Sequence, residues 1–431
     1  MNKSDPAQNS FERGLGLYEL RQYSLAEEQF RKTLAYAPQY ATAHAYLALS
    51  LLAQHSPSNP QPAQLHEALS EARKAAAAAP DQAFAFYVLS WASLINDREN
   101  EALEAAKTGM RLEPEDTWGY LIYSSIYINR SEWENALRSA EAGLRLDPKH
   151  VGLLNKRSYA LIMLDRMDEA ENSLLSALSL DPNSDTAHSH RGWLALHKND
   201  RSAALKHFRE ALRLDPQSEA ARKGFLTAMQ ARNPLYNLLL RYSLFTSRLS
   251  RENAINFALA LSGLYTVLHV MAQAFFPFYL IYWPFRIFYS IFAFFTWTAD
   301  AFFYLLLGLS RSGRLLLSKD EKAAGAAFGV CSAVFLGNVI GAIIQWEWGF
   351  AAGAVLSVLM MQPVAAVYKL SPQAKGRRAV LAVMATWLGI TAACAQTGAF
   401  LMQPWAILVL VFFFFGWATF PWVANLLILV E

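Results

Sequence analysis

Three polar side chains in the long apolar stretches after residue 253 could carry chemistry: His269, Asp300 and Asn338. Ionisable groups inside apolar helices are the material of proton relays and ion sites. At the rise of an α-helix, His269 would lie ~22 Å and Asp300 ~13 Å from the same membrane surface, so the two are not level. We expect Asp300 to be the best single functional candidate. A hydrogen-bonded structural role is the alternative.

Other motifs of catalysis or metal binding are missing from the sequence. It contains no GxSxG serine, no HExxH pair and no glycine-rich phosphate loop. His188 and His190 are two residues apart on an expected helix and point away from each other, while His197 and His207 fall on different helices. The two cysteines stand in apolar segments and suggest no disulfide framework. We therefore expect no enzymatic activity, no metal and no cofactor.

The charge is divided unevenly along the chain. Residues 1–232 hold 26 Lys and Arg and 29 Asp and Glu, whereas residues 233–431 hold only 12 and 6. Eighteen charges over 199 residues cannot solvate a globular surface, so the second part requires a lipid environment. The small basic excess does not indicate a nucleic-acid partner.

Prolines recur through the first part at a fixed spacing. Successive steps are 34 residues, except a first step of 42 that contains a Pro- and Ser-rich insertion from Ser56 to Gln64. Such a period is typical of stacked helical hairpins, in which each unit covers the apolar face of the next. The prolines are Pro38, Pro80, Pro114, Pro148, Pro182 and Pro216.

Small residues recur inside each unit, where two antiparallel helices would cross. The units start near Ala7, Ala41, Ala83, Thr117, Val151 and Asp185. Position eight holds Gly14, Ala48, Ser90, Ser124, Ser158 and Gly192. Position twenty holds Ala26, Ala68, Ala102, Ala136, Ala170 and Ala204. With six units in register, residues 7–216 resemble a tetratricopeptide repeat (TPR) array, and residues 219–232 resemble the cap helix of such an array.

The resemblance implies an all-α solenoid, 1–232, whose first helices line a groove for a protein or peptide. Carried over by position, the groove residues would be Phe84, Tyr87, Trp91, Trp118, Leu121, Asn155, Tyr159 and Trp193. The alternative is that several of these side chains pack between neighbouring helices.

Residues 233–253 join the two parts. Leucine and aromatic residues recur there at helical spacing, interleaved with Arg241, Arg248 and Arg251. This pattern predicts an amphipathic juxtamembrane helix at the lipid headgroups. A last solenoid helix is the alternative.

Residues 254–431 are predicted to form a polytopic helical membrane domain of six spans, with five as the alternative. Residues 254–309 contain two spans with a break at Pro277–Pro284, and the others cover about 323–344, 348–369, 378–397 and 404–429. Basic residues fall on one side of this arrangement, with Arg286 as the exception: Arg241, Arg248, Arg251, Arg311, Arg314, Lys319, Lys322, Lys369, Lys375, Arg377 and Arg378. The solenoid and both termini are therefore expected to be cytoplasmic.

A stripe of small residues marks the third span, with an answering set in the fourth. We expect the two spans to pack closely. An interface between copies of the chain is the alternative. The stripe consists of Gly325, Gly329, Ala333, Gly337 and Gly341, answered by Gly349, Gly353 and Ser357.

The whole pattern resembles bacterial integral-membrane TPR proteins, which would place the chain in the bacterial cytoplasmic (inner) membrane. Our leading hypothesis is a non-enzymatic scaffold that binds a cytoplasmic protein or peptide through the solenoid groove. The alternative is a transporter or channel regulated by the solenoid. An intramembrane enzyme ranks last, because no catalytic pair converges.

Overall fold

The computed structural model describes residues 5–54, 62–249, 251–274, 276–309, 314, 317–345, 347–368, 375–401 and 403–429. All regular elements in these ranges are helices, which confirms the predicted all-α class. The chain divides into two compact units, Met1–Leu259 and Ala260–Glu431.

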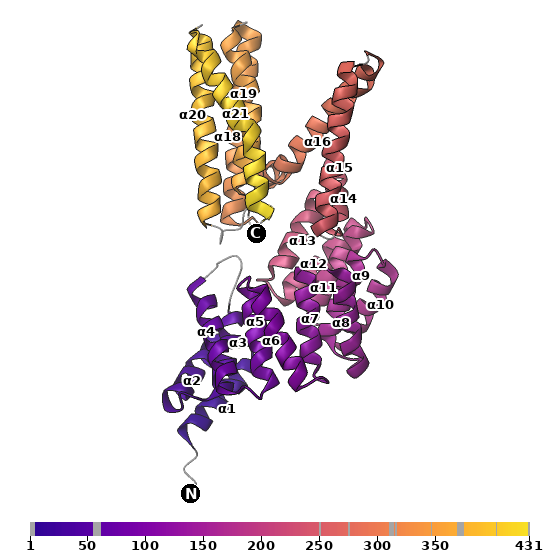
Figure 1. The fold of residues 1–431 in the computed structure, drawn as a ribbon, viewed down its shortest axis with the longest axis vertical. Coiled ribbons are helices and arrows are strands. Elements are labelled where there is room, and N and C mark those ends of the chain that lie inside the picture. The colour runs from indigo at the N-terminus through magenta and orange to yellow at the C-terminus, as the bar shows by residue number, and fades with distance from the viewer. Residues whose placement is uncertain are drawn as a thin grey trace. The chain divides into compact units, whose positions relative to one another are not determined.

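The first unit is a row of helical hairpins (Figure 1). Their first helices begin at the residues where the sequence places the repeat starts, or one residue earlier. These are α1 (Pro6–Glu19), α3 (Ala41–Ala53), α5 (Ala83–Ile95), α7 (Thr117–Asn129), α9 (Val151–Met163) and α11 (Asp185–His197). The second helices are α2 (Tyr23–Tyr36), α4 (Pro62–Ala78), α6 (Glu99–Leu112), α8 (Trp133–Leu146), α10 (Met167–Leu180) and α12 (Arg201–Leu214).

Two more helices complete this unit. α13 (Glu219–Gln230) packs on α11 and α12, and α14 (Pro234–Ser247) follows it. Of the predicted loop from Ser56 to Gln64, residues 56–61 lie outside the described residues, and α4 already begins at Pro62.

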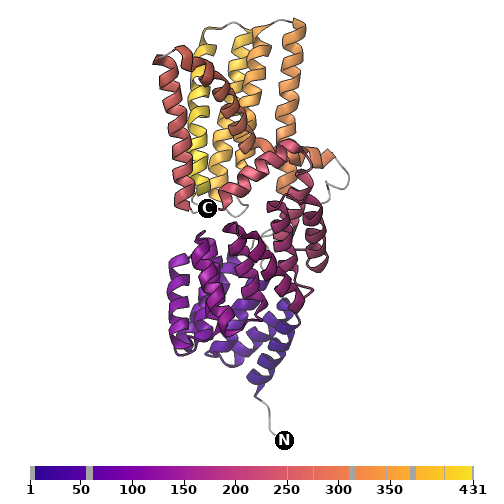
Figure 2. The same ribbon diagram turned by 90° about the vertical axis from the view of Figure 1, so that its right-hand side faces the viewer.

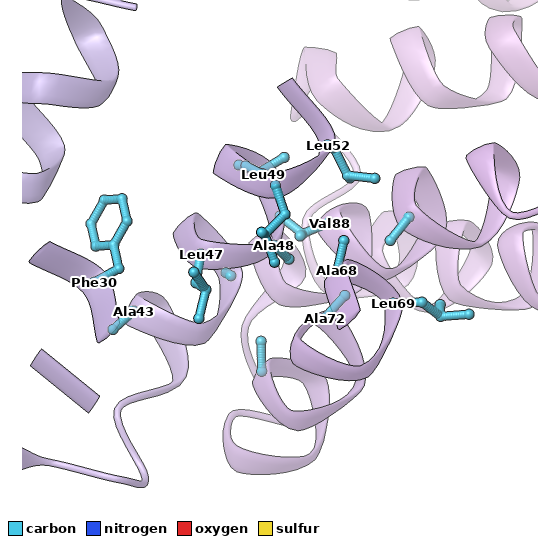
Figure 3. Packing of buried hydrophobic residues seen from close by; sticks show 14 of the residues in the cluster. Phe30, Ala43, Leu47, Ala48, Leu49, Leu52, Ala68, Leu69, Ala72 and Val88 are labelled. Carbon is cyan, nitrogen blue, oxygen red and sulfur yellow. The ribbon is translucent and has the colours of Figure 1, made fainter. Parts of the chain in front are cut away.

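The helices of each hairpin cross where the small residues recur. The six alanines at position twenty are fully buried. In two repeats the position-eight serine also bonds across the crossing: Ser90 Oγ donates to the Ala102 carbonyl at 2.6 Å, and Ser124 Oγ donates to that of Ala136 at 3.0 Å. Alanine and leucine side chains fill the space around the crossings, as the core beneath repeats one to three shows (Figure 3).

The first and last repeats fill the helix crossing with different side chains. Their position eight is glycine and their position 24 is phenylalanine. A Cβ added to Gly14 would lie 2.7 Å from the Phe30 ring, and one on Gly192 would lie 2.6 Å from the Phe208 ring. Both rings are fully buried. The repeats with serine or alanine at position eight hold alanine or leucine at position 24: Ala72, Ala106, Ala140 and Leu174.

This complementarity predicts a non-additive double variant. Gly192→Ala should destabilise the solenoid by about 1–3 kcal/mol through overpacking, and Phe208→Ala by about 3–5 kcal/mol through the cavity it leaves. The double variant should cost less than the sum, because its pair resembles Ser124 and Ala140. Circular dichroism melting of the full chain in mild detergent measures each. Gly16→Ala, where no neighbour lies within 4 Å, is the control and should not destabilise. Additive penalties would refute this packing account.

The repeating prolines also anchor the next repeat. In three repeats a polar side chain at position four returns to the proline six residues earlier. His44 Nε2 lies 2.9 Å from the Pro38 carbonyl oxygen, Tyr120 Oη donates to that of Pro114 at 3.2 Å, and His188 Nε2 lies 3.2 Å from that of Pro182. These bonds fasten the turn between successive repeats to the helix that follows it.

The second unit contains six helices within the described residues, the first shared with the solenoid unit: α15 (Arg251–Ala274), α16 (Phe276–Leu309), α18 (Lys319–Gln345), α19 (Trp348–Val367), α20 (Lys375–Phe400) and α21 (Trp405–Leu429). α18 to α21 pack side by side in sequence order (Figure 2). Among the residues that the structure describes, three helical segments are long and apolar enough to cross a membrane: Lys319–Gln345, Trp348–Val367 and Gly376–Ala399. The other predicted spans remain predictions.

The predicted break at Pro277–Pro284 is wrong. α16 begins at Phe276 and includes Pro284 inside the helix. Proline is tolerated within a helix when neighbouring groups satisfy the backbone that it frees. The prolines alone therefore did not reveal that residues 277–284 are helical.

The glycine stripe of α18 serves more than one neighbour. Gly325 and Gly329 face α16, where an added Cβ would lie 2.8 Å from the Leu305 backbone nitrogen and 3.0 Å from the Leu305 side chain, respectively. Gly341 faces Phe350 of α19, as predicted. Nothing lies within 4 Å of Gly337, and Ala333 is exposed. The predicted close packing of the third and fourth spans is confirmed, since α18 packs along α19, but part of the stripe contacts α16 instead.

A polar contact joins three helices of this bundle. Gln396 Nε2 of α20 donates to Asn338 Oδ1 of α18 at 2.5 Å. Gly353 of α19 lies against both side chains, since a Cβ there would overlap each of them. Gly349 and Ser357 of α19 are also buried. Asn338, a functional candidate by sequence, holds helices together here.

Pro363 inside α19 frees the carbonyl of Leu359, four residues earlier, because proline has no N–H. The Trp417 indole of α21 donates to that oxygen at 3.0 Å. A partner from a neighbouring helix is how apolar bundles accommodate an interior proline.

This contact predicts that Trp417→Phe lowers stability by about 1 kcal/mol, because a buried acceptor loses its donor. In the Pro363→Ala background the backbone N–H is restored, so the same substitution should cost clearly less. Thermal unfolding of the four chains in detergent provides the comparison. An equal loss in both backgrounds would show that the indole N–H has no such role.

Candidate functional site

Aromatic rings from three successive first helices form a row on the solenoid. The Phe84 ring lies 5.3 Å from the Tyr46 ring and 5.8 Å from the Trp118 ring, centroid to centroid. Phe84, Trp91 and Trp118 are partly buried against the core and partly exposed. The resemblance places these three in a groove, and their exposed parts leave apolar surface for a ligand.

Tyr87 is a core residue, which corrects its assignment to the groove. Its side chain is fully buried. The ring occupies the space over Gly109, where an added Cβ would overlap it, and the hydroxyl group reaches Gly119. The hydroxyl group donates to the Glu113 carbonyl at 3.2 Å. The glycines around Tyr87 were the sequence signal that its ring is enclosed.

Two further candidates partly contact neighbouring helices. The Trp193 ring packs edge-on against Phe208 of its own repeat, with 5.5 Å between centroids. Leu121 extends to Gly152 of the next first helix. Both side chains keep some exposed surface.

The last two repeats replace apolar residues with polar ones at two adjacent positions. Position five holds Asn155 and Ser189, which are 7% and 3% exposed, and Asn155 Oδ1 and Ser189 Oγ are buried without a hydrogen-bond partner. Position six holds Lys156 and His190. The corresponding residues of repeats three and four at position six are Val88 and Ile122. Sequence analysis did not name Lys156 and considered His190 only as a metal ligand, although this substitution pattern was a visible signal.

Burial controls the protonation of this polar pair. Desolvation lowers the pKa of Lys156 to about 8. Desolvation also lowers the pKa of His190 to about 4, and the Lys156 charge adds to the effect. The Tyr159 ring lies between His190 and Trp133, at centroid distances of 5.4 and 6.1 Å, and burial raises the pKa of its phenol.

α14 packs on the solenoid at the turns between paired helices. Its Tyr236, Leu239 and Leu240 side chains are buried, whereas Leu238 and Phe245 are 58% and 50% exposed. On its buried face α14 therefore packs as a last solenoid helix, which was the alternative prediction. Its other face keeps exposed apolar side chains.

Arg248, just beyond α14, is held by three groups. The Trp133 indole donates to its carbonyl at 2.8 Å. Its guanidinium group lies 2.8 Å from Asp165 Oδ1 and 2.8 Å from His197 Nδ1. Because Trp133 also contacts Tyr159, Arg248 lies close to the polar half of the candidate groove, which contains Lys156, Tyr159 and His190.

A histidine pair forms where the sequence suggested separate helices. His188 Nδ1 of α11 lies 3.4 Å from His207 Nδ1 of α12. His188 Nε2 faces the Pro182 carbonyl oxygen at 3.2 Å and therefore donates to it. Within the described ranges, no group of three or more His, Cys, Asp or Glu side chains could hold a metal ion.

The polar candidates of the apolar helices do not converge on one site. His269 Nδ1 lies 2.8 Å from Tyr282 Oη. Tyr282 precedes Asp300 by eighteen residues of α16, ~27 Å of helix, and Asn338 is engaged with Gln396.

Family models match three parts of the solenoid. Residues 186–218 match one tetratricopeptide repeat model, and residues 11–58 and 125–185 match another. The solenoid consists of tetratricopeptide repeats. No curated protein matches the sequence.

The TPR solenoid is similar to several solved structures. It is 19% identical to a chain of the APC/C hetero-tetramer Cut9-Hcn1, over 53% of this chain and 44% of that one, with a TM-score of 0.46. The present chain thus spans less than half of that relative. It is 19% identical to Pseudomonas aeruginosa pilF, over 54% of this chain and 100% of that one (TM-score 0.40). It is 24% identical to TTC0263, a thermophilic TPR protein of Thermus thermophilus, over 52% and 98% (TM-score 0.29).

Three histidines of the last TPR repeat make the solenoid sensitive to acid. Burial lowers the pKa of His190, His197 and His207 from 6.5 to about 4. Between these values the unfolded chain binds more protons than the folded chain, so stability must fall as the pH falls from about 6.5 toward 4.

We expect the melting temperature of the solenoid to drop between pH 7.5 and 5.0 at constant ionic strength. These histidines titrate within this pH range when the chain is unfolded. Replacing the three histidines with glutamine should flatten this dependence, because the differential proton uptake is removed. His66→Gln is the control, since His66 is exposed on α4, and it should keep the wild-type slope. A wild-type melting temperature that is constant over this range would contradict the assignment.

Proposed function

We propose that this chain is a membrane-anchored, non-enzymatic scaffold whose TPR solenoid binds a protein partner. The observation that carries the proposal is the aromatic row of Phe84 and Trp118, with Trp91 nearby, which keeps exposed apolar surface on successive first helices. Such surface gains free energy when an apolar segment covers it.

The two halves of the groove favour different parts of a partner. The aromatic half suits apolar or aromatic side chains. The polar half offers Lys156, whose ammonium group is desolvated and forms no ion pair in the described structure. A carboxylate there would offset that desolvation. An extended peptide with apolar residues and an acidic group fits both halves.

Pull-down with the full chain in mild detergent tests this function. Trp91→Ala with Trp118→Ala should reduce recovery of a specific partner by about tenfold or more, as removal of aromatic hot spots does. Leu175→Ala, at a residue of α10 that is 48% exposed, is the matched control, and circular dichroism checks folding. A folded double variant with undiminished recovery would count against the groove.

We also propose that α15, α16 and α18 to α21 form six membrane spans, with the solenoid and both termini cytoplasmic; three of these segments are long and apolar enough to cross a membrane. The basic residues on one side of the spans support this orientation. At that side Arg378 of α20 makes two hydrogen bonds, of 3.1 and 3.0 Å, to Asp320 at the start of α18. Arg311 and Lys369 lie outside the described residues. Cysteine labelling of the solenoid from outside intact cells would refute the orientation.

A transporter or channel regulated by the solenoid is the second candidate, favoured by the contacts of His269. The engagement of Asn338 in helix packing weakens it. Loss of a flux on Asp300→Asn at normal expression would support this candidate over the scaffold.

A further inference from the structure

Polar side chains line one side of α15 and meet α16. Tyr265, His269 and Gln273 recur every four residues, so they lie on one face of α15. Tyr282 of α16 is 3% exposed and contacts two of them: its Oη atom lies 2.8 Å from His269 Nδ1 and 3.4 Å from Tyr265 Oη. We call these four residues the polar ladder.

The hydrogen bonds of the ladder define the state of its histidine. Gln273 Nε2 lies 3.2 Å from His269 Nε2, and an amide nitrogen can only donate. His269 Nε2 is therefore the acceptor, and Nδ1 carries the proton that it donates to Tyr282.

The only Lys or Arg between residues 252 and 310 is Arg286, one helical turn beyond Tyr282. Its guanidinium carbon lies 5.2 Å from the Trp283 ring centroid and 5.9 Å from that of Tyr282, and its side chain is exposed. The two rings hold the cation by cation–π attraction beside the ladder.

No acidic residue of this hairpin can neutralise Arg286. Residues 253–299 contain no Asp or Glu. Asp300 is fourteen residues further along α16, ~21 Å of helix. Glu252 is thirteen residues before Tyr265, the residue linked to Tyr282, and so ~20 Å away along α15. A cation in apolar surroundings is costly unless an anion pairs with it. Within the described residues no acidic side chain forms an ion pair with Arg286, so an anion from outside the chain can serve as its counter-ion.

We propose that Arg286 and the polar ladder bind the phosphate group of an anionic membrane lipid. The inference rests on the proposed insertion of the second unit into a bilayer. The guanidinium group matches phosphate in shape and charge, and Gln273, which is exposed, offers a neutral donor in the polar ladder. Exposed apolar side chains on both helices would contact the acyl chains: Leu264, Val267, Leu280 and Ile287.

Native mass spectrometry of the full chain tests this site. The chain is released from nanodiscs that contain equal amounts of phosphatidylcholine and phosphatidylglycerol. The wild type should retain phosphatidylglycerol in preference to phosphatidylcholine. Arg286→Gln should lower that preference by about tenfold, the value of one charge-assisted contact, and Arg286→Lys should lower it less. Arg314→Gln, at an exposed arginine beyond the end of α16, is the matched control and should retain the lipid.

Each outcome separates the site from the membrane proposal. The lipid site alone would be overturned by one result. The wild type enters nanodiscs, but the wild type and a folded Arg286→Gln chain retain phosphatidylglycerol equally. Displacement of the lipid by millimolar inorganic phosphate would show that free phosphate is the ligand and would overturn the assignment to a lipid. Failure of the wild type to enter nanodiscs would overturn the membrane proposal and this site with it.

Discussion

The close crossing of paired helices is the constraint on which the solenoid depends. Helix backbones can approach this closely only where side chains are small, and the space beside the crossing must then be filled. Four repeats combine serine or alanine at position eight with alanine or leucine at position 24. The first and last repeats combine glycine with Phe30 and Phe208, whose rings fill the volume that the missing Cβ leaves. The same hairpin geometry is thus reached by two packing solutions.

In the second unit, too, helices approach closely where residues are small, but polar contacts between helices accompany the close approach. Gly325 and Gly353 admit neighbouring groups to within a distance that a Cβ would forbid. Polar bonds then hold the helices in place, through Asn338 and Gln396 and through Trp417, which satisfies the carbonyl freed by Pro363. In the proposed bilayer no water can replace these partners, so each polar group needs a neighbour from another helix.

The candidate groove combines two kinds of surface because the repeats differ at single positions. Aromatic side chains on α5 and α7 leave apolar surface, whereas Lys156 and His190 bring desolvated polar groups to α9 and α11. Arg248 ties the segment after α14 to Trp133, and Trp133 touches Tyr159.

The sequence alone determined the helical class, the repeats and their starts, because 34-residue periodicity and small residues at fixed positions follow from helix geometry. It also identified where apolar helices occur, since charge and hydropathy are properties of local segments. Only the tertiary structure decided that Tyr87 is enclosed, that α16 runs through Pro284, that His188 meets His207 and that Tyr282 joins His269 beside Arg286. These outcomes depend on which side chains from distant segments share one space, and linear spacing does not contain that information.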